Sequence, residues 1–314
     1  MQGTEIIRGV HNIAPRHRGC VATIGNFDGV HVGHKMMLDT LIARAREHDL
    51  PSVLVTFEPL PLEFFERESV LPRLTRFREK ITLLKQTQLD RVLCIPFNEQ
   101  TAATPAEDVV RDFLVDGLGV RWLVVGDDFR FGAGASGDYE LLTSLGAALD
   151  FGVTRMPTCE IDGGRVSSTR IRGVLAAGDF DAAQRLLGYP YFIMGRVVYG
   201  RQLGRQLGVP TANIRLQRYR AALEGVYAVQ VEGEGLSRRF DGIANIGVRP
   251  TVDGKEPQLE VNLFDYSGDL YGRLLTVTFC HKLRDERKFD GLPELKAQIE
   301  LDIGAARAWF EGRG

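Results

Sequence analysis

Cysteine and long apolar runs are both scarce in this 314-residue sequence. Its four cysteines, Cys20, Cys94, Cys159 and Cys280, lie far apart and form no C-x-x-C pair, which argues against a disulfide framework and predicts reduced thiols. The N-terminal stretch "MQGTEIIRGVHN" lacks the apolar core of a signal peptide. No apolar run approaches the ~18 residues that a membrane helix needs. We therefore predict a cytoplasmic protein with no membrane partner.

A dominant charge is also missing, because 39 basic and 41 acidic residues leave a net charge of −2. No global field draws the chain to nucleic acid or anionic lipid, so we predict no nucleic-acid partner. Apolar residues make up 44% and charged residues 25% of the sequence, a balance typical of globular proteins. The length suits two domains of about 150 residues each.

The first half alternates short apolar runs with longer helical patterns. Strands are predicted at 21–25, 52–57, 90–97 and 120–126, and helices at 34–48, 74–86 and 105–118. This alternation predicts an α/β domain with a Rossmann-like, doubly wound parallel sheet. Ligands of such sheets bind beyond the carboxyl ends of the strands. The segments "GNFDGVHVGH" and "GDDFRFGAGASGD" both follow strands, so we expect them on the same rim.

The pattern of apolar runs changes after a helical segment at 169–188. Short alternating runs separated by glycine turns fill 192–280, which predicts a small antiparallel β-barrel or sandwich. An amphipathic helix over 293–312, with Pro293 in its first turn, closes the chain. We therefore predict domains at 1–188 and 189–314.

The stretch "GNFDGVHVGHK" places two histidines where a strand becomes a helix. Unsatisfied N–H groups at a helix N-terminus attract phosphate, and Gly25, Gly29 and Gly33 let the backbone approach a ligand. His31 and His34 are three residues apart and share a helix face, where they could stabilise charge on a phosphoryl oxygen. A zinc site, an ordinary surface turn and a glycine-rich turn of a sugar or dinucleotide binder are the alternatives.

Two motifs of this half make the sequence recognisable. The segment "HVGH" resembles the H-x-G-H signature of nucleotidyltransferases, and its surroundings are similar to the bacterial FAD synthetase branch. "SSTRIR" (167–172) resembles the later phosphate-binding motif of that family. The resemblance implies a nucleotidyltransferase domain with His31, His34 and Arg170 as catalytic residues. It implies ATP or phosphate contacts from Gly25, Phe27, Asp28, Gly33, Ser167, Ser168 and Thr169.

The segment "GDDFRFGAGASGD" admits two interpretations. "GAGASG" (132–137) fits the dinucleotide pattern G-x-G-x-x-G, but "DDFRF" separates it from the preceding strand, so a Rossmann NAD site is disfavoured. The family resemblance instead implies a flavin-binding loop with Asp127, Phe129 and Arg130 as contacts. An aromatic ring beside a guanidinium can stack on a planar ring and neutralise a phosphate.

The most specific stretch of the second half is "GRVVYGRQLGRQLGVPTANI" (195–214). It is no Walker A loop, because no G-K-[ST] follows, and it resembles the riboflavin kinase motif in which a glycine-rich loop runs into P-T-A-N. The resemblance implies ATP contacts from Gly200 and Gly204. It also implies that Thr211 and Asn213 hold Mg²⁺ with ATP, a pairing that suits a hard cation.

The same resemblance marks Glu260, in "LEVNLFDY", as the general base for the terminal ribityl hydroxyl. Without the motif, a lone glutamate in a strand is more often a solvated outward residue. The loop at 284–289 is implied to close over flavin, with Arg284 as a contact. Three positions depart from the residues expected in the family, namely Leu60, Tyr199 and Asn262.

Taken together, these motifs occur in the expected order over almost the whole chain, which is similar to the bacterial bifunctional riboflavin kinase/FMN adenylyltransferase family. The resemblance implies riboflavin, FMN and ATP as substrates and Mg²⁺ as cofactor. Two rival hypotheses are an adenylyltransferase for another substrate with a non-catalytic barrel, and a flavin-binding regulatory or RNA-binding protein without catalysis. A homo-oligomer, the passage of FMN between sites and a preference for reduced flavin stay open.

Overall fold

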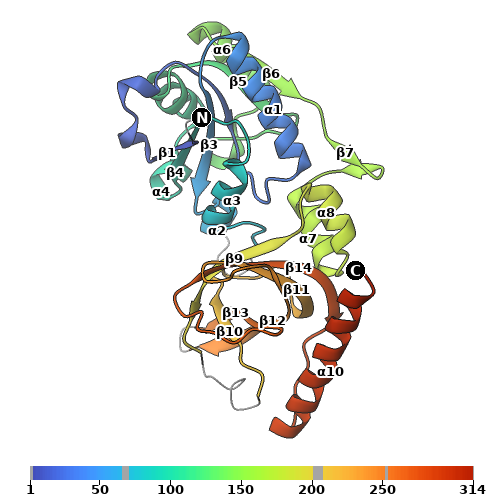
Figure 1. The fold of residues 1–314 in the computed structure, drawn as a ribbon. Coiled ribbons are helices and arrows are strands. Elements are labelled where there is room, and N and C mark those ends of the chain that lie inside the picture. The colour runs from blue at the N-terminus through green and yellow to red at the C-terminus, as the bar shows by residue number, and fades with distance from the viewer. Residues whose placement is uncertain (1–2, 66–70, 201–207, 252–253, 314) are drawn as a thin grey trace. The chain divides into compact units, whose positions relative to one another are not determined.

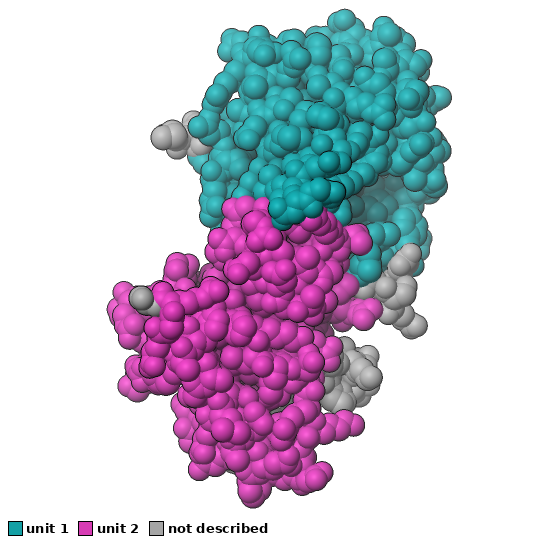
Figure 2. All heavy atoms as spheres, turned by 90° about the vertical axis from the view of Figure 1, so that its right-hand side faces the viewer, with its two compact units in different colours: residues 1–71, 80–167 teal, residues 72–79, 168–314 magenta. Residues whose placement is uncertain are grey.

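In the computed structural model, which describes residues 3–65, 71–200, 208–251 and 254–313, the chain builds one parallel sheet and one closed barrel (Figure 1). It divides into two compact units, coloured separately in Figure 2. Unit 1 comprises residues 1–71 and 80–167, and unit 2 comprises residues 72–79 and 168–314. Among the described residues, no helix combines the length and the apolar character needed to cross a membrane.

Unit 1 contains a six-stranded sheet in which every strand pairing is parallel. Its strands, in chain order, are β1 (Glu5–Arg8), β2 (Cys20–Ile24), β3 (Ser52–Glu58), β4 (Arg91–Pro96), β5 (Val120–Gly126) and β6 (Gly152–Met156). Their order in the sheet is β1-β4-β3-β2-β5-β6. The predicted parallel α/β architecture is confirmed. The two edge strands, β1 and β6, were absent from the sequence prediction, because both are short and partly exposed.

The helices of the first half follow the strands. They are α1 (Val32–Glu47), α2 (Pro61–Phe65), α3 (Phe77–Leu84), α4 (Glu99–Ala103), α5 (Ala106–Asp108) and α6 (Tyr139–Leu149), with short 3₁₀ turns η1 (Val10–Asn12), η2 (Pro15–His17) and η4 (Ala133–Ala135). The division between the units falls inside α3, between Glu79 and Lys80. A hairpin of β7 (Glu160–Ile161) and β8 (Gly164–Arg165) ends unit 1.

The segment at 105–118, predicted as a helix, contains two helical geometries. Only α5 is α-helical, and η3 (Val109–Gly117) continues it as a π-helix. The apolar pattern is nevertheless satisfied, because Val109, Val110 and Leu114 are buried in the core of unit 1. The predicted helix is therefore present, and most of its length has π-helical rather than α-helical geometry.

Unit 2 is a closed antiparallel barrel. In the sequence, helices precede the first barrel strand and follow the last one. Helices α7 (Ser168–Ala176) and α8 (Phe180–Leu187) precede β9 (Phe192–Val198), β10 (Ala212–Arg215), β11 (Gly225–Gly233), β12 (Phe240–Thr251), β13 (Gly254–Leu263), β14 (Leu274–Arg284) and α10 (Leu292–Glu311). The strand order is β10-β13-β12-β11-β14-β9, and the pairing of β9 with β10 closes the ring. The structure is a barrel rather than a sandwich, and it includes β10 at the end of the glycine-rich stretch, where no strand was predicted.

The units do not coincide with the predicted domains. Residues 168–188 and 72–79 group with the barrel, whereas the sequence placed the boundary after residue 188. The division into compact units describes packing, so a functional boundary at 188 stays a prediction.

Candidate active sites

The first site lies at the carboxyl ends of β2 and β5, which are neighbours in the sheet of unit 1. The chain moves from β2 to β3 and β4 on one side and then to β5 and β6 on the other, so the strand order reverses here. Open α/β sheets bind ligands in the crevice at such a reversal. The segments that follow the two strands, at 25–31 and 127–131, are the ones singled out from the sequence.

His31 is the N-cap of α1. Its Nδ1 accepts a hydrogen bond from the backbone N–H of His34 at 3.3 Å, which satisfies one of the free donors at the helix start. The helix consequently begins at Val32, two residues before the predicted start. Because Nδ1 is an acceptor, the neutral ring carries its proton on Nε2 and can donate from there.

The two imidazoles form a stack. The ring centroids of His31 and His34 lie 3.6 Å apart, and the ring of Phe27 stacks on His34 at 4.5 Å. Phe27 is buried, so its ring supports the histidines from behind. Within the part of the chain that the structure describes, Nδ1 of His34 is buried and makes no hydrogen bond. A buried polar atom without a partner is costly and marks a place where a bound ligand could supply one.

Burial keeps both rings neutral. It lowers the pKa of His31 to about 4, with Asp28 opposing the shift and Arg165 adding to it. It also lowers the pKa of His34 well below its usual value, with further contributions from His31 and Lys80. A neutral imidazole keeps one N–H group, so it can donate a hydrogen bond to a phosphate oxygen without first gaining a second proton.

Two predicted glycines have a local steric role. A Cβ on Gly33 would lie 3.3 Å from the His31 ring, and one on Gly25 would lie 3.3 Å from the Phe27 ring. Either contact would press on the ring stack. Asp28, between them in sequence, is 3% exposed. These glycines therefore preserve the position of the histidine pair, while their contact with ATP stays a prediction.

The segment after β5 is held by its own contacts. Asp127 accepts a short hydrogen bond from Thr158 and lies 3.9 Å from Arg165; the Thr158 hydroxyl and, less strongly, Arg165 lower the pKa of Asp127. Phe129 stacks on Phe131 at 5.4 Å and packs against the core. The predicted flavin contacts of Asp127 and Phe129 stay predictions.

Two arginines near this segment pair with carboxylates. The guanidinium of Arg130 pairs with Asp138, the N-cap of α6, at 3.1 Å, so its predicted flavin contact stays untested. Arg165, on β8, pairs with Asp128 and acts on His31. Sequence analysis passed over Arg165 although it stands two residues before Ser167.

The four residues "SSTR" fall on both sides of the division into units. Ser167 is the last residue of unit 1, and Ser168 is the first residue of α7 in unit 2, followed by Thr169 and Arg170 in its first turn. A role beside the histidines stays a prediction for these four residues.

The second site is built on three neighbouring strands of the barrel. Register places Glu260 of β13 directly opposite Asn213 of β10 on one side and Asn245 of β12 on the other. Directly opposed residues project from the same face of a sheet. Thr211, Asn245 and Glu260 line a cavity of about 300 Å³, so the strand register brings the predicted base beside the predicted metal ligands. Asn245 was not identified from the sequence.

Thr211 and Asn213 fit a magnesium ion. Asn213 is 6% exposed, and its Oδ1 accepts a hydrogen bond from Gln258 at 2.6 Å, which orients the amide and leaves its second lone pair for a cation. Mg²⁺ keeps several waters and phosphate oxygens, so two protein oxygens suffice. A Cβ on Gly200 would lie 2.4 Å from the Asn213 side chain, which gives that glycine a steric reason. Gly204 lies outside the described residues.

Helix α10 and the segment after β14 form the remaining wall of this cavity. Leu295 and Ile299 of α10 and Phe289 contribute apolar surface that suits a flat aromatic ligand. Arg284 also lines the cavity, but its guanidinium forks onto Asp302 of α10, with N–O distances of 2.7–3.0 Å. This ion pair attaches α10 to the end of β14, and the flavin contact of Arg284 stays a prediction.

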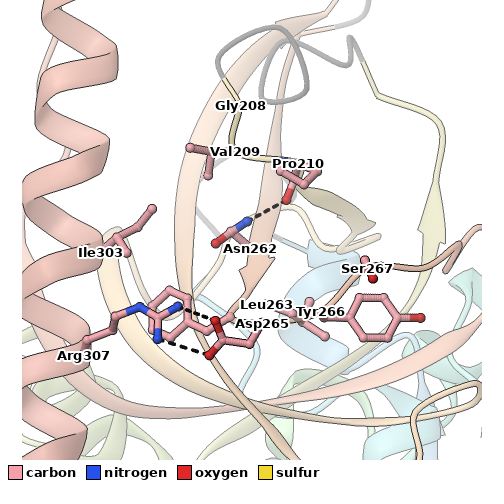
Figure 3. A pocket seen from close by; sticks show the side chains of 11 residues that line it. Gly208, Val209, Pro210, Asn262, Leu263, Asp265, Tyr266, Ser267, Ile303 and Arg307 are labelled. Atoms are coloured by element: carbon pink, nitrogen blue, oxygen red, sulfur yellow. Dashed lines mark hydrogen bonds and ion pairs between the residues drawn. The ribbon is translucent and has the colours of Figure 1, made fainter.

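A second cavity, of about 440 Å³, shares Val209 and Asn262 with the first. Figure 3 shows the Nδ2 of Asn262 donating to the carbonyl of Pro210, at 2.8 Å, and Arg307 pairing with Asp265. Asn262 is one of the three departures from the family pattern, and it lines both cavities. Tyr199 is 75% exposed and stacks on Tyr271, and Leu60 is buried.

Comparisons with known proteins cover both halves of the chain. The family model described as FAD synthetase matches residues 13–170, and the one described as riboflavin kinase matches residues 187–310. The protein named bifunctional riboflavin kinase/FMN adenylyltransferase from Pseudomonas fluorescens is 52% identical, covering 97% of each chain. Proteins of the same name from Escherichia coli K12 and Haemophilus influenzae are 48% and 43% identical, covering 98% of this chain and 98% and 99% of their own.

A solved structure supports the fold over the full length. The crystal structure of a macrolide-efflux protein from Streptococcus pneumoniae superposes with a TM-score of 0.80 at 30% identity, covering 98% of this chain and all of that one. Its name differs from the names of the sequence relatives, whereas its fold matches that of this chain in both units described here.

Proposed function

This chain belongs to the bifunctional riboflavin kinase/FMN adenylyltransferase family, and on that basis we propose that it makes FAD from riboflavin in two steps. In unit 2, the γ-phosphoryl group of ATP passes to the terminal hydroxyl of riboflavin, giving FMN and ADP. At the histidine site, a phosphate oxygen of FMN then attacks the α-phosphorus of a second ATP. The bond between the α-phosphorus and the bridging oxygen breaks, giving FAD and pyrophosphate.

The observation that carries the kinase assignment is the row formed by Asn213, Glu260 and Asn245. Because Glu260 lies across from Asn213, a hydroxyl bound at Glu260 lies close to phosphates bound at Asn213 and Thr211. The carboxylate of Glu260 accepts the hydroxyl proton as the new P–O bond forms. The two adjoining cavities can hold the flavin and the nucleoside of ATP, with the reacting groups near Val209 and Asn262, which line both. Mg²⁺ at Thr211 and Asn213 would neutralise charge on the ATP phosphates.

The adenylyl transfer rests on the neutral histidine pair at the start of α1. Because Nδ1 of His31 accepts a hydrogen bond, Nε2–H is the donor of the neutral ring and would donate to a phosphate oxygen. The helix N-terminus adds backbone donors and a partial positive charge. No covalent intermediate is needed, because positioning and charge stabilisation account for most catalysis in phosphoryl chemistry.

Two substitutions test whether the steps are separate. Glu260→Gln should lower FMN formation from riboflavin by about 100-fold or more, because the general base is lost. His31→Asn keeps an N-cap acceptor and removes the imidazole, so it should lower FAD formation from FMN by about 100-fold while α1 stays capped. Chromatography of the products formed with ATP and Mg²⁺ gives both rates.

Each variant is the control for the other. Glu260→Gln should still convert FMN to FAD, and His31→Asn should still convert riboflavin to FMN. If either variant lost both activities while its thermal unfolding matched that of the unaltered protein, the assignment of one step to each site would be wrong.

The cytoplasmic location is part of the same proposal. It rests on four cysteines that form no disulfide, together with the ATP that both steps consume.

A further inference from the structure

The turn between β2 and α1 adopts a backbone conformation that its residues rarely choose. Phe27, Gly29 and Val30 all have positive φ angles, of 47°, 85° and 37°. Glycine tolerates this region, but a β-branched residue such as Val30 is a clear exception there. Conformations of this kind persist only where the surrounding structure holds them, and they concentrate at functional sites.

A buried lysine holds the first residue of this turn. Lys80 of α3 is fully buried, and its Nζ donates to the backbone carbonyl of Asn26 at 2.6 Å. The same Nζ lies 3.2 Å from Oγ1 of Thr56 on β3, and that hydroxyl donates to the Asn26 carbonyl at 3.4 Å. One carbonyl, immediately before Phe27, is therefore fixed by side chains from two different elements.

The charge of Lys80 also acts on the histidine site. It contributes to lowering the pKa of His34, after burial and His31, which places the ammonium within electrostatic reach of the imidazole pair. Burying a lysine is costly, because the charged form loses its hydration. A polyphosphate at the helix N-terminus would interact favourably with a positive charge near the rings.

We propose that Lys80 is a positioning residue for adenylyl transfer, which keeps the Asn26–Val30 turn in its binding shape and adds a fixed positive charge near the two histidines. This inference rests on the proposed function of the histidine site. Lys80 touches the turn, and its effect on the reaction passes through Asn26 and the imidazoles. A residue of this kind changes turnover without being part of the reacting groups.

The test compares Lys80→Met, which keeps most of the side-chain volume, with Lys80→Arg, which keeps the charge. A misplacement of about 1 Å can cost ~100-fold in rate, so Lys80→Met should lower kcat for FAD formation from FMN by about 10- to 100-fold. It should also weaken the binding of inorganic pyrophosphate, measured by calorimetry, by about tenfold and make that binding less sensitive to salt. Lys80→Arg should restore most of the pyrophosphate affinity and its salt dependence.

Lys85 provides the matched control, because it is an exposed lysine just beyond the end of α3. Lys85→Met should leave FAD formation and pyrophosphate binding unchanged. FMN formation from riboflavin should be unchanged in every lysine variant. A Lys80→Met protein that forms FAD and binds pyrophosphate within threefold of the unaltered protein would overturn the proposal. Equal losses of pyrophosphate binding in the Met and Arg variants would overturn the role of the charge.

A second pair of variants keeps the inference testable if Lys80→Met fails to fold. Thr56→Val removes the hydroxyl that shares the Asn26 carbonyl, and Thr56→Ser retains it. The valine variant should lower kcat for FAD formation several-fold more than the serine variant, and equal rates would overturn the role of the carbonyl anchor. If the unaltered protein itself formed no FAD from FMN, the proposed function would fail, an outcome distinct from failure of the lysine variants.

Discussion

His31 has one observed role and one proposed role, and they depend on different nitrogens of the same ring. Its Nδ1 caps α1, and its Nε2 remains available to a ligand. Burial favours the neutral form, which both roles require, because a protonated Nδ1 could no longer accept the backbone hydrogen bond. The observed cap and the proposed catalytic role therefore require the same protonation state.

The buried neutral ring predicts a pH-dependent stability. His31 has a pKa of about 4 in the folded protein against an ordinary 6.5, so between these values the unfolded chain binds a proton that the folded chain does not. Stability must then fall as the pH falls through this window, by about 1.4 kcal/mol per pH unit. Between about pH 7.5 and pH 5.5, the free energy of unfolding of the unaltered protein should fall by about 1.4 kcal/mol more than that of His31→Asn.

Urea unfolding followed by tryptophan fluorescence measures this difference. The chain has two tryptophans, so Trp309→Phe leaves Trp122 in unit 1 as the reporter. From pH 7.5 to 8.5 the variant and its parent should change equally, since the imidazole is neutral in both states. An equally steep loss of stability in both proteins at acid pH would contradict a buried neutral His31.

Helix α10 connects the two cavities of unit 2. Leu295 and Ile299 line one cavity, and Ile303 and Arg307 line the other. The helix is attached to the rest of the unit by arginine–carboxylate pairs, of which Arg284–Asp302 is the most buried. Exposed ion pairs contribute little to stability, whereas a buried carboxylate with two-pronged hydrogen bonds contributes more.

Asp302→Asn should therefore loosen α10. The variant keeps the size of the side chain but removes the charge that Arg284 binds, so unfolding free energy should fall by about 2 kcal/mol. Riboflavin affinity should fall as well, because the helix carries part of the cavity wall. Glu300→Gln, on the same helix in an exposed pair with Lys296, should change stability by less than about 0.5 kcal/mol.

Trp309, on α10, reports this transition in a Trp122→Phe background, and quenching of riboflavin fluorescence measures the affinity. Equal effects of the two substitutions would show that the buried pair does not attach the helix.

Unit 2 is assembled from two separate stretches of the chain. Residues 72–79 belong to it together with 168–314, and the contact between the stretches includes a fully buried ion pair. Both oxygens of Glu79 accept from Arg218, at 2.5 and 2.7 Å, and Glu79 also accepts from the backbone N–H of Met194. Arg218 donates further to the carbonyls of Arg73 and Leu74. A fragment that began at residue 189 would lose Glu79 and leave Arg218 without this carboxylate.

Breaking this pair should cost more than replacing it. Glu79→Gln leaves a buried guanidinium without its counter-charge, so we expect unit 2 to lose about 3 kcal/mol of unfolding free energy. The double variant Glu79→Met/Arg218→Met removes both charges and should recover more than half of that loss. Urea unfolding in the Trp122→Phe background measures both values. A double variant as unstable as the sum of the single variants would contradict this account.

Much of this protein could be predicted from local sequence. The alternation of apolar runs identified a parallel sheet followed by short antiparallel strands, because the side-chain periods of strands and helices are short-range properties. The motifs around His31, Thr211 and Glu260 identified the family, because each is contiguous in the chain. Register confirms that Glu260 and Asn213 are neighbours, while their predicted roles remain to be tested.

Other features depend on residues that are far apart in the chain. Local patterns did not reveal that Lys80 reaches the carbonyl of Asn26, that Glu79 pairs with Arg218, or that α3 is divided between two units. A charged side chain in an amphipathic helix is usually on the solvent face. Glu79 and Lys80 of α3 are buried only because distant partners compensate their charges. Periodicity and motifs are local, whereas burial and long-range hydrogen bonding exist only once the chain has folded.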